Sequence, residues 1–421
     1  MSADTVGRQW AGKAAALDRY RWLLLRERHG WLGSALRFLR EALGDTLFGL
    51  LARFRLASGA GGEPCDFLLL QSAPKVIGFQ RKKLLIEALR NRGHVLIETA
   101  LPEASTLLRE RLLRRPPQPV PLRYFAYAAH AEWLVEHYTP KVVLNDRNGS
   151  LYSPFLRLAL SARQALLVHL AHATTVESSR RLGMNDYDYY FLFGQSSLEA
   201  LQARALRFGS STALLAGSHM IDTAFDLAPA DPGRRVLLVL GVGPDKEKEA
   251  GYQRTYRLLR DWAARNPDYQ VLVKAHPRSQ VPFWQQEASV LDNVQVLPRD
   301  CGLAEALACA SVVVNIMSNA VIEAALARRP LLYVNASDDA DIFAQERFLG
   351  PCVATLEGLQ TAVSGIEQDH AAALARSADF AEYHLAHGCS GLAWNIQALT
   401  NLLEGRRPSG VSVALTSTVE Q

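Results

Sequence analysis

The sequence is poor in cysteine, and its cysteines form no recognisable pair. Five cysteines are scattered over 421 residues without a Cys-x-x-Cys motif, at Cys65, Cys301, Cys309, Cys352 and Cys389. Because an odd number of scattered thiols cannot all pair within the chain, a reducing compartment fits best. No clustered histidine completes a zinc site beside Cys301 and Cys309, so the sequence predicts no metal.

Long apolar runs and a secretory signal are also lacking. The apolar runs of the N-terminal segment are interrupted by charge well before the roughly 20 residues that a membrane-spanning helix needs. The chain begins with polar residues, and no apolar core with a small-residue cleavage site follows them. We therefore expect a cytoplasmic protein without a signal peptide.

A large excess of charge of one sign is absent, because the formal net charge is +4 at pH 7. Hydrophobic residues make up 49% and charged residues 21% of the chain, which is typical of a folded protein, and the length suits two domains. The N-terminus is nevertheless rich in arginine, at Arg19, Arg21, Arg26, Arg28, Arg37, Arg40, Arg53 and Arg55. This charge lies on one segment without the signature of a known module, so we expect no nucleic-acid partner.

Residues 1–58 form an extension whose later part, Asp18 to Leu56, interleaves arginine with Trp, Leu and Phe. This composition predicts amphipathic helices and leaves two interpretations open. In the first, the extension binds an anionic membrane peripherally, at the inner face of the cell membrane. In the second, it forms a helical hairpin, broken near Gly30 and Gly33, that packs on the enzyme or on the second subunit of a homodimer.

From Asp66 onward, short apolar runs alternate with amphipathic helices, which predicts parallel sheets covered on both faces. We expect an α/β protein with two doubly wound Rossmann-like domains facing a cleft. The first covers residues 66–225, the second covers residues 232–405, and residues 406–421 form a flexible tail. Because ligands of such sheets bind at the carboxyl ends of the strands, the residues that follow each strand are candidate site residues.

Two strand ends of the second domain carry groups suited to a diphosphate. Gly241 and Gly243 permit a tight turn in which backbone amides can approach a phosphate. Lys274, His276 and Arg278 offer three donors to phosphate within five residues, after a strand predicted over 270–274. The simpler alternatives are an ordinary turn and a solvated basic triplet.

A third strand, predicted over 312–315, is followed by Ser318 and Asn319, either of which can cap the next helix. Free amides at that helix start can meet a phosphate. Glu323 falls one turn inside the helix within an apolar run, and ribose hydroxyls would satisfy its carboxylate. The alternative is an ordinary helix with a partly exposed glutamate.

In the first domain, Asp146 and His172 follow two predicted strands and would occupy neighbouring loops. Either side chain can remove a proton from a hydroxyl group, as direct displacement at a sugar carbon requires. Alternatively, Asp146 is only a turn former and His172 only a polar loop residue.

Together, the glycine turn, Lys-x-His-Pro-Arg at 274–278 and Ser-Asn-x-x-x-Glu at 318–323 resemble the donor half of B-type (GT-B) bacterial glycosyltransferases. The His-Pro element resembles that of sialyl- and Kdo-transferases and of CDP-glycerol glycerophosphotransferases. Val-His-Leu-Ala-His at 168–172, followed by 186–190 and 194–196, is similar to their histidine-containing strand end and the strand after it. The resemblance covers about residues 66–400.

The resemblance implies transfer of a sugar, by direct displacement and without a cofactor, from a nucleotide-sugar donor to a cell-surface glycan or glycolipid acceptor such as lipopolysaccharide, O-antigen or capsule. Asp146 or His172 would act as the base. The donor nucleotide would be held by Gly241, Gly243, Lys274, His276, Arg278, Ser318, Asn319 and Glu323. The acidic pair of several sialyl- and Kdo-transferases is replaced at 145–149 by Asn-Asp-Arg-Asn-Gly, and a suitable Asp-x-Asp loop is lacking. The alternatives are a non-hydrolysing UDP-sugar epimerase and a non-catalytic nucleotide-binding scaffold.

Overall fold

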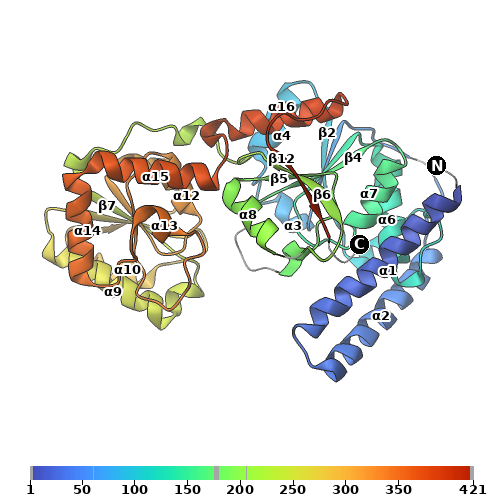
Figure 1. Ribbon diagram of the computed structural model, residues 1–421, viewed down its shortest axis with the longest axis horizontal. Coiled ribbons are helices and arrows are strands. Elements are labelled where there is room, and N and C mark those ends of the chain that lie inside the picture. Colours follow the sequence, from blue (N-terminus) through green and yellow to red (C-terminus); the bar gives the residue numbers. More distant parts are fainter. Residues whose placement is uncertain (1–2, 60, 175–179, 205, 418–421) are drawn as a thin grey trace. The chain divides into compact units, whose positions relative to one another are not determined.

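The computed structural model describes residues 3–59, 61–174, 180–204 and 206–417. The chain divides into two compact units, shown in Figure 1. The N-terminal unit comprises residues 1–220 and 392–421, and the C-terminal unit comprises residues 221–391. Each unit contains its own mainly parallel sheet, so the expected α/β class with two Rossmann-like domains is confirmed.

The sheet of the N-terminal unit has seven strands in the order β12-β6-β5-β4-β3-β1-β2. All neighbours run parallel except β12, which is antiparallel to β6. In the β3–β4 register Asn145 lies beside His169, which brings the loops after these two strands together. The strands are β1 (Phe67–Gln71), β2 (Leu96–Ala100), β3 (Val142–Asn145), β4 (Leu166–Leu170), β5 (Tyr189–Leu192), β6 (Ser210–Leu215) and β12 (Ser412–Thr416).

Amphipathic helices connect these strands. In α4 the apolar Leu85, Ile86 and Leu89 recur at helical spacing and pack into the core beside Phe67 of β1. This packing fixes the start of α4, and Lys82 directly precedes it. The connecting helices are α3 (Pro74–Ile77), α4 (Lys83–Asn91), α5 (Ala104–Arg109), α6 (Leu122–Tyr138), α7 (Ser153–Ser161) and α8 (Gln195–Ala203).

The N-terminal extension is a hairpin of α1 (Ala3–Arg26) and α2 (Trp31–Arg53), with the break at Gly30 as one interpretation expected. Helix α1 packs on the N-terminal unit, because Trp10 is buried and stacks on Phe155 with ring centroids 6.0 Å apart. Helix α2 packs closely on α6, since a β-carbon at Gly49 would lie 1.8 Å from the Leu122 carbonyl oxygen. The hairpin is therefore part of the N-terminal unit.

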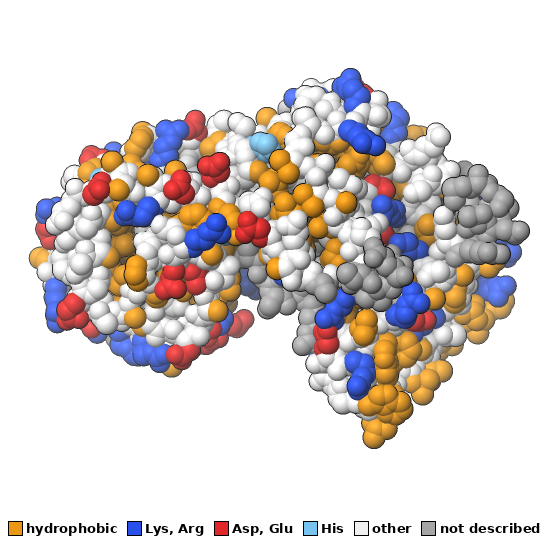
Figure 2. Space-filling model, in the orientation of Figure 1, with side chains coloured by type: hydrophobic (Ala, Val, Ile, Leu, Met, Phe, Trp, Pro, Cys, Tyr) orange, Lys and Arg blue, Asp and Glu red, His pale blue; other side chains and the backbone are white. Residues whose placement is uncertain are grey.

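The outer face of α2 remains exposed. Its large apolar residues fall on one stripe of a helix with 3.6 residues per turn, and Figure 2 shows hydrophobic side chains gathered along the hairpin. We call this stripe the α2 ridge; it consists of Leu32, Leu36, Leu39, Leu43, Leu47, Leu50 and Phe54. None of the described helices is both long and apolar enough to span a bilayer.

The predicted C-terminal boundary is wrong. We expected the second domain to run to residue 405 and residues 406–421 to form a flexible tail, but the chain returns to the N-terminal unit after residue 391. Helix α16 (Gly391–Leu403) packs Ile396 and Leu399 into the N-terminal core, and β12 adds a strand to that sheet. The apolar face of α16 packs against the core of the first sheet, and the short strand β12 pairs with β6 of that sheet.

The C-terminal unit has five parallel strands in the order β11-β10-β7-β8-β9. The chain enters at the central strand β7, builds one side and then returns to add β10 on the other, so the switch point lies between β7 and β10. The strands are β7 (Val236–Leu240), β8 (Gln270–Lys274), β9 (Val294–Val296), β10 (Val312–Asn315) and β11 (Leu331–Tyr333). The helices are α9 (Ala250–Arg265), α10 (Pro282–Glu287), α11 (Leu303–Cys309), α12 (Ala320–Leu326), α13 (Gln345–Leu349), α14 (Leu356–Gln368) and α15 (His370–His384).

Candidate active site

The glycine turn after β7 lies against the basic loop after β8. A β-carbon at Gly241 would lie 2.9 Å from the Lys274 carbonyl oxygen and 3.0 Å from the His276 nitrogen, so a side chain here would displace backbone. A β-carbon at Gly243 would lie 3.8 Å from Arg278 Nη2. The structure thus brings together five of the residues predicted for the donor nucleotide.

The basic loop orients His276. Its Nδ1 accepts a hydrogen bond of 3.2 Å from the backbone N–H of Arg278, which leaves Nε2 as the donor of the neutral ring. Burial lowers the pKa of His276, and the positive charge of Arg278 lowers it further. At neutral pH the loop therefore combines an uncharged imidazole donor with the charges of Lys274 and Arg278. Within the described residues, none of these three side chains pairs with a carboxylate.

A buried carboxylate holds the base of this loop. The Ser279 hydroxyl donates a hydrogen bond to Glu247, which is 4% exposed, and accepts one of 2.9 Å from the Val281 N–H. The Glu247 N–H in turn bonds the Gly243 carbonyl oxygen at 3.0 Å. These contacts tie the turn after β7 to the loop after β8. Neither Glu247 nor Ser279 was predicted as a site residue, because the sequence does not indicate that the Glu247 carboxyl group is buried beside the Ser279 hydroxyl.

The residues after β10 occupy the same edge of the sheet. The Ser318 N–H bonds Asn315 Oδ1 at 2.9 Å, and the Ser318 hydroxyl accepts a long hydrogen bond of 3.4 Å from the Ala320 N–H. Asn319 occupies the N-cap position of α12 but makes no capping hydrogen bond with its side chain. Of the two expected caps, Ser318 therefore satisfies one backbone amide and Asn319 does not.

Glu323 lies in the first turn of α12, between the fully buried Val321 and Ala324. Burial raises the pKa of its carboxyl group to about 7. Among the described residues no cation or side-chain donor pairs with it. An unpaired carboxylate of this kind is costly to keep and is suited to accept hydrogen bonds from ligand hydroxyls.

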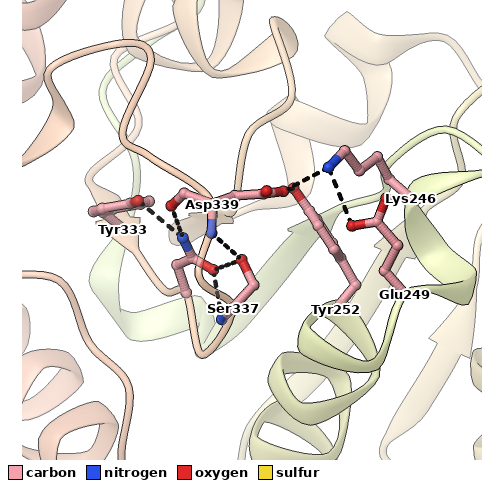
Figure 3. A network of polar contacts seen from close by, with 7 residues as sticks. Lys246, Glu249, Tyr252, Tyr333, Ser337 and Asp339 are labelled. Atoms are coloured by element: carbon pink, nitrogen blue, oxygen red, sulfur yellow. Dashed lines mark hydrogen bonds and ion pairs between the residues drawn. The ribbon is translucent and has the colours of Figure 1, made fainter.

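Figure 3 shows a polar network around Lys246, which follows the glycine turn in the chain. Lys246 bonds Asp339 at 2.8 Å and Glu249 at 3.1 Å, and the Tyr252 hydroxyl donates to the same Asp339 oxygen at 3.0 Å. These contacts lower the pKa of Asp339. The network ties the segment after β7 to the loop after β11, and it was not predicted because Asp339 lies 93 residues from Lys246.

The N-terminal unit contains a separate pocket at the carboxyl ends of β1, β3 and β4. Its volume is about 590 Å³, and both predicted bases, Asp146 and His172, line it. We expected Asp146 and His172 to lie in neighbouring loops, and both line the same pocket after the neighbouring strands β3 and β4. The other lining residues are Ser72, Ala73, Val76, Phe79, Arg81, Lys82, Arg147, Asn148, Ala173, Thr174, Leu182 and Met220.

Asp146 is held by a lysine that the sequence analysis missed. Lys82 Nζ lies 2.5 Å from Asp146 Oδ2 and 3.2 Å from Gln71 Oε1, and its side chain is 2% exposed. The other oxygen, Asp146 Oδ1, is buried and finds no hydrogen-bond partner among the residues that the structure describes. A lysine before a helix gives no signal in the sequence that it is buried, so the pair emerges only when β1, β3 and α4 come together.

Two uncharged histidines lie behind this ion pair. His169 is completely buried, and burial together with His172 and Lys82 lowers its pKa. His219 is similarly buried, with its pKa lowered to about 3 by burial, Lys82 and His172. The ring of His172 is exposed at the pocket.

No protein-family model matches this chain, and no curated protein sequence matches it either. Solved structures do match its fold. A protein from Listeria monocytogenes described as a UDP-N-acetylglucosamine 2-epimerase has a TM-score of 0.53 and 14% identity, covering 83% of this chain and 100% of its own. The S. aureus protein MnaA in complex with UDP has a TM-score of 0.52 and 11% identity, covering 82% of this chain and 100% of its own.

The UDP-GlcNAc 2-epimerase of Neisseria meningitidis, bound to UDP-GlcNAc, has a TM-score of 0.50 and 11% identity, covering 80% of this chain and 100% of its own. At such identities the likeness concerns the fold alone. The two Rossmann-like units and these matches place the chain in the GT-B class of folds. The narrower resemblance to sialyl- and Kdo-transferases is not confirmed by them.

Proposed function

We propose that this chain is a nucleotide-sugar-dependent glycosyltransferase that transfers a sugar to a cell-surface glycan or glycolipid, such as lipopolysaccharide, O-antigen or capsule. The observation that carries the proposal is the carboxyl edge of the C-terminal sheet. There, Lys274, His276 and Arg278 lie without carboxylate partners among the described residues, beside a turn that admits no side chain at Gly241. Such an edge is suited to bind a diphosphate.

Each predicted donor-site residue has a role in this proposal. Arg278 supplies charge to the diphosphate and His276 an uncharged N–H, while the Gly243 turn lets backbone approach the phosphates. Glu323, which is half-buried and has no side-chain partner among the described residues, accepts hydrogen bonds from the ribose hydroxyls. The donor is a substrate, so the reaction requires no cofactor.

The N-terminal pocket supplies the base. Asp146 Oδ1, or the ring of His172, removes the proton of an acceptor hydroxyl. The hydroxyl oxygen then forms a bond to the anomeric carbon as the bond from that carbon to the phosphate oxygen breaks, and the nucleotide leaves with the bonding electrons. Lys82 holds the other oxygen of Asp146 and so orients the carboxyl group.

In this proposal the N-terminal hairpin binds the enzyme to a membrane that contains the acceptor. The α2 ridge is flanked on the helix by the exposed Arg40 and Arg53, and this combination suits peripheral binding to an anionic leaflet. Cytoplasmic enzyme at the inner face of the cell membrane would thereby meet a lipid-linked acceptor. A second copy of the chain covering the same ridge, in a homodimer, is the competing explanation.

Epimerisation of a UDP-sugar is the second candidate, because the solved structures named above include UDP-GlcNAc 2-epimerases. That reaction needs several acidic groups around the sugar, whereas the described lining of the N-terminal pocket includes a single carboxylate, Asp146. The transferase proposal is therefore preferred.

Two measurements test the proposal. A thermal-shift panel of nucleotides and nucleotide sugars should contain at least one compound that raises the unfolding midpoint of the full chain, and the Arg278→Ala variant should lose that shift. The stabilising nucleotide sugar is then incubated with and without glycan acceptors. Acceptor-dependent release of nucleotide supports a transferase, epimerisation without acceptor supports the second candidate, and a panel without any shift refutes both.

A further inference from the structure

The pocket of the N-terminal unit has an excess of positive charge. Arg81, Lys82 and Arg147 line it, against Asp146 as the single carboxylate among the described lining residues. Lys82 is occupied by Asp146 and Gln71, so these two charges offset each other. Arg81 and Arg147 are left as exposed guanidinium groups that pair with no carboxylate in the described parts of the chain.

The wall of the pocket also contains polar atoms that lack partners. Asp146 Oδ1 and Thr174 Oγ1 are buried and have no hydrogen-bond partner within the described parts of the chain, and the two residues are 9% and 4% exposed. Because buried polar atoms are normally satisfied, their presence beside a pocket indicates a ligand with hydroxyl or other polar groups. This observation is independent of the excess charge.

The size and the remaining lining restrict that ligand further. A volume of about 590 Å³ is within the usual range of small-molecule sites and exceeds what a lone phosphate ion needs. Phe79 and Met220 add apolar surface, and the guanidinium of Arg81 stacks over the Phe79 ring at 5.7 Å. A flat side chain of this kind can lie against the apolar face of a sugar ring.

We propose that this pocket binds a phosphorylated sugar, with its phosphate at Arg81 and Arg147 and a hydroxyl at Asp146. Arginine forms paired hydrogen bonds to phosphate, which makes two free guanidinium groups at one pocket a phosphate site. The identity of this sugar as the acceptor rests on the proposed transferase function. Its binding does not, because it can be measured without any donor.

The test is calorimetric titration of the full chain with glucose 6-phosphate, inorganic phosphate, glucose and dihexanoyl phosphatidic acid. Glucose 6-phosphate should bind more tightly than the other three. Arg81→Gln and Arg147→Gln should each weaken it by about 10- to 100-fold. Lys83→Gln is the matched control, since it removes the same charge two residues from Arg81 without lining the pocket, and it should leave the affinity unchanged.

The Arg278→Gln variant tests whether glucose 6-phosphate binds instead at the basic loop of the C-terminal unit. This variant should bind glucose 6-phosphate as tightly as the wild type. Loss of that binding in Arg278→Gln alone would overturn the proposal, as would no saturable binding of any phosphate probe. Phosphatidic acid binding as tightly as glucose 6-phosphate would overturn the assignment to a sugar and indicate a lipid phosphate. UDP titrated into the same variants reports on the proposed transferase function separately, because Arg81 and Arg147 belong to the other unit.

Discussion

The two units present different chemistry at the same position of similar sheets. In the C-terminal unit the carboxyl edge offers unpaired donors and a turn that admits no side chain at Gly241. In the N-terminal unit the corresponding edge contains Asp146 with one oxygen held by Lys82, buried uncharged histidines and a pocket of about 590 Å³. The fold alone therefore does not decide what an edge binds; the few residues after each strand do.

In the proposed mechanism this difference assigns binding of the donor diphosphate to one unit and proton removal to the other. The C-terminal edge has the cations of the basic loop and an uncharged imidazole, and Glu323 is set back in the first turn of α12. The N-terminal pocket has the carboxyl group of Asp146, with one oxygen held by Lys82 and the other without a partner among the described residues. Variants in each unit should accordingly affect one activity and spare the other.

The largest effect is expected for the base. Asp146→Asn should lower turnover by about two to four decades, because the amide cannot accept the proton of an acceptor hydroxyl, while nucleotide binding should stay at the wild-type level. Steady-state kinetics and calorimetry of the same preparation measure both. His172→Ala is the parallel variant, and wild-type turnover in both would show that the comparison between the units is wrong and that the base lies elsewhere.

The C-terminal unit should show the opposite behaviour. His276→Ala and Arg278→Ala should each weaken nucleotide binding by about 1.5 to 3 kcal/mol, since each removes a contact to the diphosphate. Calorimetric titration measures this loss, and Arg265→Ala, an exposed residue in the last turn of α9, serves as the control. Donor affinity that is unchanged in both variants would remove the loop after β8 from the site.

The sequence was most informative where the signal is local. Strands β8 and β10 have the predicted bounds, because short apolar runs determine them. The placement of Gly241 beside the basic loop followed from strand ends meeting at one edge of a sheet. Contacts between distant segments were not predictable in this way. Lys82 reaches Asp146 across 64 residues, and β12 joins β6 at a separation of about 200 residues, with no local pattern to indicate either.

A smaller effect, and one that distinguishes stability from binding, is expected at Glu323. Its pKa is raised to about 7, so folding disfavours the ionised form, and the resulting loss of stability grows as the pH rises from about 4.5 to about 7 and persists above it. Glu323→Gln should therefore stabilise the ligand-free chain by about 1 to 3 kcal/mol at pH 8 and have little effect at pH 4. Denaturant unfolding at the two pH values measures this, with the exposed Glu357→Gln, in the first turn of α14, as the control.

The same variant tests the ribose assignment. If Glu323 accepts hydrogen bonds from the ribose, Glu323→Gln should weaken nucleotide binding even though it stabilises the fold. A variant that is stabilised but binds nucleotide as well as the wild type would leave the carboxylate without a role in the C-terminal site. One that is not stabilised at pH 8 would show that the carboxylate finds a partner in solution.

The smallest expected effect concerns the α2 ridge, which the C-terminal unit does not have. Each arginine near an anionic surface contributes about 1 kcal/mol, so Arg40→Gln and Arg53→Gln should each weaken liposome binding about fivefold, and less at high salt. Leu36→Gln with Leu43→Gln should reduce binding at every salt concentration, because it removes apolar area. Co-sedimentation with neutral and anionic liposomes measures both, with the exposed Arg92→Gln as the charge-matched control. Nucleotide affinity should be unchanged throughout. Ridge variants that bind liposomes like the wild type but turn a dimer into a monomer would show that a second subunit, rather than a membrane, covers the ridge.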